Sequence, residues 1–168
     1  MVKAIHKRWS AAVFGAGLLL VGVFVMQPGV AAQTGTPPVV QVGPSTNLVA
    51  NILSNVPVTL TCAPRTPDAS IFVYVTLEQA VNGKIAYGSG NLSNGSTTSG
   101  GPTLPVEVVC DGSPHRFMAG VVANTAGAPF GGGQAIVSVS VTVCTINSYS
   151  DCNSTTVGPR AITQSSDA

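Results

Sequence analysis

Charged side chains are scarce in this chain of 168 residues, where they make up 8%, against about 25% in an ordinary soluble domain. The formal net charge is +1. Because binding to a phosphate backbone needs clustered Lys and Arg, the composition excludes a polybasic nucleic-acid binder, and it equally excludes an acidic tail protein. Aromatic residues are also few (5%). What remains is a chain that is 45% hydrophobic, with a length that suits one domain.

The motifs of several common sites are missing as well. The four cysteines include no close pair of the C-x₂-C kind, which is the spacing typical of zinc ligands. Neither the G-x-S-x-G turn of many hydrolases nor the G-x-x-x-x-G-K phosphate loop occurs. We therefore expect no metal site and no cofactor.

The segment 1–32 has the three-part layout of a secretory signal peptide. Sixteen uncharged, mostly apolar residues (11–26) follow a basic start and precede a run of small residues, so we expect cleavage between Ala32 and Gln33. The alternative is an uncut membrane anchor, but a spanning helix needs about 20 apolar residues and Pro28 interrupts the run. The basic start consists of Lys3, Lys7 and Arg8.

The remainder, residues 33–168, has the composition of β-structure. It contains 25 Val and Ile residues against 6 Leu, and branched side chains favour strands. Apolar residues alternate with other residues at 70–79 and with Ser and Thr at 134–144, which predicts strands. Asn82-Gly83 predicts a tight hairpin into a strand at 84–89. The turn at 111–114 is expected to join strands at 103–110 and 115–124.

Strands at this spacing predict an all-β fold, a β-sandwich of two antiparallel sheets preceded by the signal peptide. We place an N-terminal extension at 33–47, the sandwich at 48–163 and a disordered C-terminus at 164–168. The segments 91–102 and 125–133 are rich in Gly, Ser and Thr and are predicted to be exposed loops.

The cysteines predict two disulfides. Cys62 and Cys110 lie on the apolar sides of the expected strands 56–62 and 103–110, so their sulfurs can meet in the core. Cys144 lies on the polar side of its strand, eight positions before Cys152. We therefore pair Cys62 with Cys110 and Cys144 with Cys152, in keeping with export to an oxidising environment.

Asp111, Ser113 and His115 form the one cluster suggestive of chemistry. They have the residue types of a hydrolytic triad, but adjacent residues on a turn rarely adopt triad geometry, and turn chemistry accounts for all of them. Glu78 and Glu107 are interpreted as surface charges.

Two further features concern the surface. Phe72 and Tyr74 lie opposite the apolar face of their strand, and we expect them to be buried in the sandwich, with an exposed aromatic patch as the alternative. Three N-x-S/T glycosylation motifs occur in predicted loops: Asn91, Asn94 and Asn153.

The segments V-T-L-T-C, SIFVYVTLEQ and V-V-C-D-G-S-P-H, followed by a Val/Ser strand ending in Cys, resemble small exported bacterial immunoglobulin-like domains of unknown function. The resemblance covers residues 56–162 and implies a fold and an export route, with no assigned activity. More distantly, the layout is similar to the two-disulfide apoproteins that sequester enediyne antibiotics in a cleft between sheets.

The expected function is that of a non-catalytic secreted or cell-surface module with a structural, adhesion or interaction role. Its partner would be an extracellular protein or surface component, with membrane contact only through an uncleaved signal segment. The alternative is a carrier that binds an apolar small molecule in a cleft of the sandwich. A weaker alternative is a hydrolase that uses Ser113 and His115.

Overall fold

The computed structural model describes residues 35–65, 69–94, 103–105, 107–146 and 148–166, apart from the side chains of 148–150. The predicted signal peptide and its cleavage site between Ala32 and Gln33 lie outside these residues. The described residues form eight strands and no helix. None of them forms a helix long and apolar enough to span a membrane. In chain order the strands are β1 (Val39–Val42), β2 (Ser45–Val49), β3 (Leu53–Thr61), β4 (Ala69–Val81), β5 (Lys84–Ser93), β6 (His115–Ala123), β7 (Gly133–Thr145) and β8 (Ser148–Ser166).

Several local predictions are confirmed. β4 and β7 cover the two alternating segments, and their apolar sides are buried. β4 turns into β5 at Asn82-Gly83, where both residues have positive φ (50° and 74°). This is the conformation that Asn-Gly favours in a two-residue hairpin.

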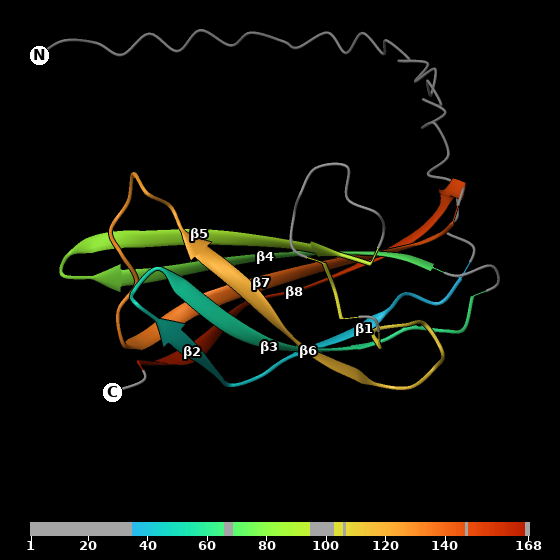
Figure 1. Ribbon diagram of the computed structural model, residues 1–168, viewed down its shortest axis with the longest axis horizontal. Coiled ribbons are helices and arrows are strands. Elements are labelled where there is room, and N and C mark those ends of the chain that lie inside the picture. The colour runs from blue at the N-terminus through green and yellow to red at the C-terminus, as the bar shows by residue number, and fades with distance from the viewer. Residues whose placement is uncertain (1–34, 66–68, 95–102, 106, 147, 167–168) are drawn as a thin grey trace, which may run out of the picture. The chain divides into compact units, whose positions relative to one another are not determined.

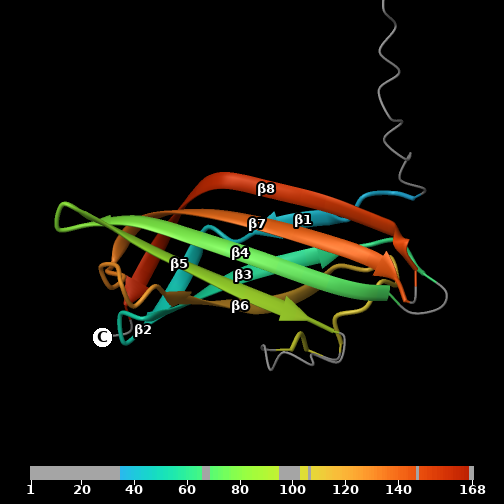
Figure 2. The same ribbon diagram turned by 90° about the horizontal axis from the view of Figure 1, so that it is seen from above.

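The prediction of an immunoglobulin-like sandwich is wrong, because the sheet closes on itself. The hydrogen-bonded order β3-β2-β8-β7-β4-β5-β6 returns to β3 through a β3–β6 pairing that extends from Leu53↔Val122 to Leu60↔His115. Seven strands therefore form a barrel, and β1 lies beside the second half of β3 (Figures 1 and 2). The β2–β8 pairing is parallel while the others are antiparallel, so the barrel is mixed.

Closure depends on a close approach of the β5 and β6 backbones. They share only the pairs Gly88↔Ala123 and Ser89↔Val122. A Cβ atom at Gly88 would lie 2.6 Å from the carbonyl oxygen of Val122, and one at Gly90 would overlap the carbonyl oxygen of Gly120. Real Cβ atoms do not come this close to backbone oxygens, so the seam requires glycine on β5.

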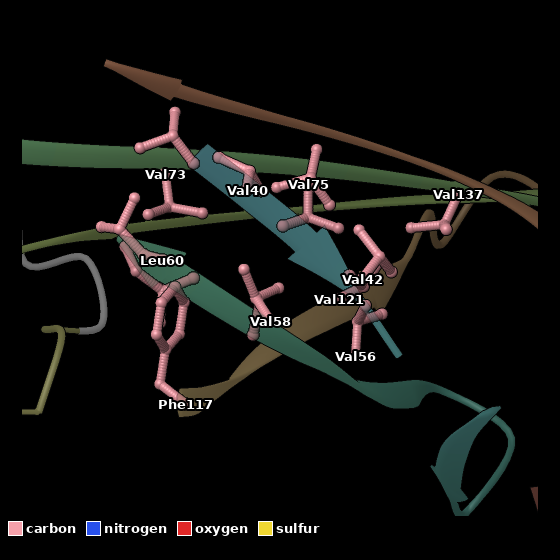
Figure 3. Packing of buried hydrophobic residues seen from close by; sticks show 14 of the residues in the cluster. Val40, Val42, Val56, Val58, Leu60, Val73, Val75, Phe117, Val121 and Val137 are labelled. Atoms are coloured by element: carbon pink, nitrogen blue, oxygen red, sulfur yellow. The ribbon is translucent and has the colours of Figure 1, made fainter. Parts of the chain in front are cut away.

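The barrel is filled by side chains. Val56, Val58 and Leu60 on β3 point toward Val73 and Val75 on β4, and all five are at most 2% exposed (Figure 3). Small barrels have interiors of a width that such side chains fill. The inward face of every strand is therefore occupied by the core.

The loop before β7 closes one end of the barrel. Residues 125–133 were predicted to be an exposed loop, yet Phe130 is only 2% exposed. Gln79 holds the loop in place: its amide donates to the carbonyl of Gly131 and accepts from the Gly131 N–H, both at 2.8 Å. The glycines give this segment the composition of a surface loop, although its Phe130 side chain packs inside.

Three other segments differ from expectation. The segment 103–110 is not a strand in its described part: Pro105 has no N–H to donate, and its carbonyl accepts from the Val108 N–H in a turn (3.0 Å). The segment 33–47, expected to be an extension, supplies β1 and most of β2. β8 continues to Ser166, beyond the expected end of the domain at 163.

The structure contains the two disulfides that the strand faces suggested. Cys62 is bonded to Cys110 across 48 positions, and Cys144 to Cys152 across eight. In the loop-entropy model the first contributes about 4 kcal/mol and the second about 2.5 kcal/mol to stability. The first ties the irregular segment before β6 to the end of β3, and the second joins β7 to the start of β8.

We expect Gly90→Ala to lower the free energy of unfolding by about 1–3 kcal/mol, since the added methyl group forces β5 away from β6. Urea unfolding measures the change. Gly131→Ala is the matched control, because a Cβ there would meet Val81 at an ordinary 3.6 Å. Equal stabilities of the two variants would show that the seam tolerates a side chain.

Candidate functional site

The Asp111–Ser113–His115 cluster is a structured turn. Oδ1 of Asp111 accepts from the Ser113 N–H at 2.7 Å and lies 2.9 Å from Nε2 of His115. Gly112 has a φ of 90°, and its N–H donates to the Cys62 carbonyl. These are the contacts of a turn that carries the chain from Cys110 into β6.

The cluster lacks the central contact of a hydrolytic triad. Within the described residues no hydrogen bond joins the Ser113 hydroxyl to His115. Asp111 is bonded to both the Ser113 backbone and the His115 ring, so one carboxylate oxygen organises the whole turn. The predicted structural role accounts for every contact that this cluster makes.

The two glutamates that the sequence analysis interpreted as surface charges lie on the surface in the structure. Glu78 and Glu107 are both exposed, as expected for surface charges. The part of the chain that the structure describes contains no group of three or more His, Cys, Asp or Glu residues placed to hold a metal ion.

A cleft of about 430 Å³ opens at the end of the barrel near the Cys62–Cys110 disulfide. Its volume falls within the usual range for small-molecule sites. The guanidinium of Arg65 already contacts Asp151 (3.3 Å) and Thr145 (3.0 Å), so its charge is largely compensated. The described lining is otherwise partly apolar and comprises Ala69, Ser70, Asn94, Thr103, Leu104, Val108, Val109, Cys110 and Ile146.

The three glycosylation motifs lie in different environments. Asn91 is exposed on β5, so it lies on a strand and not in the predicted loop. The Asn94 amide accepts from the Ile71 N–H (2.7 Å) and donates to the Ala69 carbonyl (2.8 Å). Asn153 is fully buried on β8, and among the described residues neither of its amide atoms has a hydrogen-bond partner. Asn153 is therefore inaccessible to modification in the folded protein.

Three exposed aromatic residues and two exposed isoleucines lie on the outer face of β4, β5 and β7. We call this surface the aromatic face; its members are 36–65% exposed and comprise Phe72, Tyr74, Ile85, Tyr87 and Ile136. Figure 2 shows β5, β4, β7 and β8 side by side in this part of the barrel. The expectation that Phe72 and Tyr74 are buried is wrong, because the outer side of a single closed sheet has no second sheet packed on it.

Two tyrosines lie along this face. Tyr87 is directly opposite Glu78, four positions along β4 from Tyr74, a separation of about 13 Å at 3.3 Å per residue. The hydroxyl oxygens of Tyr74 and Tyr87 are nevertheless 3.5 Å apart. Both side chains must therefore lean along the sheet. The hydrogen bond with Tyr74 raises the pKa of Tyr87, with smaller contributions in the same direction from partial desolvation and from the charge of Glu78.

Beside the aromatic face, two rows of Ser and Thr hydroxyl groups run across β7 and β8; we call them the hydroxyl rows. In the first, Tyr74 is opposite Ser140, whose Oγ lies 3.1 Å from Oγ1 of Thr156. In the second, Phe72 is opposite Thr142, whose Oγ1 lies 2.8 Å from Oγ of Ser154. Each row thus begins with an aromatic side chain on β4 and continues with hydroxyls on β7 and β8.

A shallow groove of about 290 Å³ adjoins the aromatic face at its other end. Ile85 and Ile136 form part of its lining, and Glu78 borders it.

The sequence already showed the two-residue alternation that creates this outer surface, since the outward residues of each strand alternate with the core residues. It did not show which strands are neighbours, and that determines which outward residues meet.

Comparison of the chain with protein-family models, with curated proteins and with solved structures found no match.

The Asp111 contacts predict a pH dependence. The hydrogen bond from His115, and then that from the Ser113 N–H, lower the pKa of Asp111. A lowered folded-state pKa stabilises the fold above the unfolded-state value of about 3.9, and this stabilisation is lost as the pH falls through the folded-state pKa. We expect the wild type to be more stable than Asp111→Asn near neutral pH, and the difference to shrink on acidification below about pH 4. Urea unfolding across this range measures it, and a pH-independent difference would contradict the assignment.

The two asparagines give opposite predictions. Asn153→Leu removes a buried amide without partners, so we expect the free energy of unfolding to rise by about 1–3 kcal/mol. Asn94→Leu leaves the Ile71 N–H and the Ala69 carbonyl without their partner, so we expect a loss. Thermal unfolding of both variants tests this, and a destabilised Asn153→Leu would show that the amide is satisfied.

Proposed function

We propose that this chain is a non-catalytic interaction module that works at or outside the cell surface and binds a surface component through the aromatic face. The observation that carries the proposal is the exposure of five large apolar side chains on adjoining strands. Contiguous exposed apolar surface is typical of interaction sites, and tyrosine is enriched where a few residues dominate binding energy.

The interior and the turn support this choice. Side chains from all eight strands form one buried cluster inside the barrel, which favours a ligand site outside this core. The Asp111 turn is explained by its structural contacts. These findings favour binding at the outer surface over chemistry within the described residues.

The location outside the cell rests on two features. Disulfides are typical of secreted and extracellular proteins, and the chain contains two. The layout of segment 1–32 supports secretion or display at the cell surface.

The second candidate function, carriage of an apolar small molecule, is favoured by the cleft of about 430 Å³ beside Cys110. Its ligand would contact the apolar part of the lining, because Arg65 is already paired with Asp151. Native mass spectrometry of the exported, unreduced protein would detect such a ligand by its added mass.

The test of the main proposal compares two places on the outer surface. The exported full chain is incubated with the envelope fraction of its producing cells, and the bound fraction is measured. We expect the double variant Tyr74→Ser/Tyr87→Ser to bind at least tenfold more weakly, since aromatic anchors typically contribute about 2 kcal/mol or more.

Met118→Ser is the control, because Met118 is 51% exposed on β6 but outside the aromatic face. Equal losses in both variants, or no loss in the tyrosine variant, would refute the use of this face. Sustained turnover of a hydrolysable substrate by the wild type would refute the non-catalytic part.

A further inference from the structure

We infer that the ligand of the aromatic face and the hydroxyl rows is an uncharged polysaccharide. This inference rests on the proposed function and names the class of surface component that is bound. It is carried by the placement of Tyr74 and Phe72 at the head of two parallel rows of hydroxyl groups.

The aromatic side chains supply the apolar half of such a site. A pyranose ring has one face of C–H groups, which carry partial positive charge and pack on the negative face of an aromatic ring. Tyr74 and Phe72 are each 43% exposed, and Tyr74 lies along the sheet because its hydroxyl meets that of Tyr87. A side chain that lies along the surface offers contact area to an extended chain.

The hydroxyl rows supply the polar half. Each Ser and Thr hydroxyl has one donor and two acceptor positions, and a polyol presents the same mixture of donors and acceptors. In the pairs Ser140–Thr156 and Thr142–Ser154 the β8 residue is exposed and the β7 residue is half-buried, and each pair uses only part of this capacity. Adjacent strands lie about 4.8 Å apart, a spacing comparable with the length of one sugar ring, so successive rings can meet successive strands.

The lack of charged side chains in the hydroxyl rows favours an uncharged ligand. Neither row contains a charged side chain, and the nearest charge along β4 is Glu78, four positions from Tyr74. An anionic polymer would find no cation to pair with in these rows and would be repelled by Glu78. A lipid surface would leave the remaining hydrogen-bonding capacity of the paired hydroxyls buried and unused, which costs free energy. An uncharged polyol incurs neither cost.

The experiment is co-sedimentation of the exported full chain with insoluble cellulose, chitin and β-1,3-glucan, and with calcium pectate as the anionic counterpart. We expect retention on at least one uncharged polymer, unchanged by added salt because no ion pairs contribute. Tyr74→Ser and Thr142→Val should each weaken this retention at least tenfold, while Tyr74→Phe should lower it less than Tyr74→Ser. Met118→Ser should bind as the wild type, and urea unfolding verifies that each variant is folded.

Failure to bind any uncharged polymer would overturn the inference, as would binding to calcium pectate alone or unchanged retention of Tyr74→Ser. Concentration-dependent dimerisation abolished by Tyr74→Ser would also overturn it, by assigning the face to a second copy of the chain. A further measurement separates the polysaccharide inference from the proposed function. If envelope binding survives periodate oxidation of the glycans but is lost after protease treatment, the module binds a protein. In that case the polysaccharide inference fails while the proposed function stands.

Discussion

The close approach of β5 and β6 is the contact on which the remaining architecture depends. Two residue pairs, Gly88↔Ala123 and Ser89↔Val122, join one end of the strand order to β6, whose long pairing with β3 completes the ring. Without this seam the sheet would have two free edges, which are prone to pairing with other chains. Glycine is required because the space that a side chain would occupy at Gly88 and Gly90 is filled by backbone carbonyls of β6.

Closure also decides where function can reside. In a barrel of this size the inward residues belong to the core, which favours the outer surface or the ends as ligand sites. The alternation that directs Val73 and Val75 inward directs Phe72 and Tyr74 outward. The core and the aromatic face thus both follow from the alternation of inward and outward residues, and the proposed binding surface needs no departure from that pattern.

Local features were therefore predictable, and the global arrangement was not. The alternation at 70–79 and 134–144 and the Asn82-Gly83 turn depend on neighbouring residues, which a sequence displays directly. Whether β6 pairs with β3 or lies in a second sheet depends on contacts between distant segments, and alternation is identical in a sandwich and a barrel. The same ambiguity misplaced Tyr74, since an outward residue is buried in one arrangement and exposed in the other.

The scarcity of charge, which first excluded several functions, also bears on how this surface can bind. Long charged side chains lose about 1.5–2 kcal/mol of rotamer entropy when fixed, whereas shorter side chains generally lose less. The hydroxyl rows consist of Ser and Thr, and pairs such as Thr142 and Ser154 are already held by a hydrogen bond. They stand on strands tied by the Cys144–Cys152 disulfide. A surface ordered before binding loses little freedom on binding, and this favours the proposed recognition through weak uncharged contacts repeated along two rows.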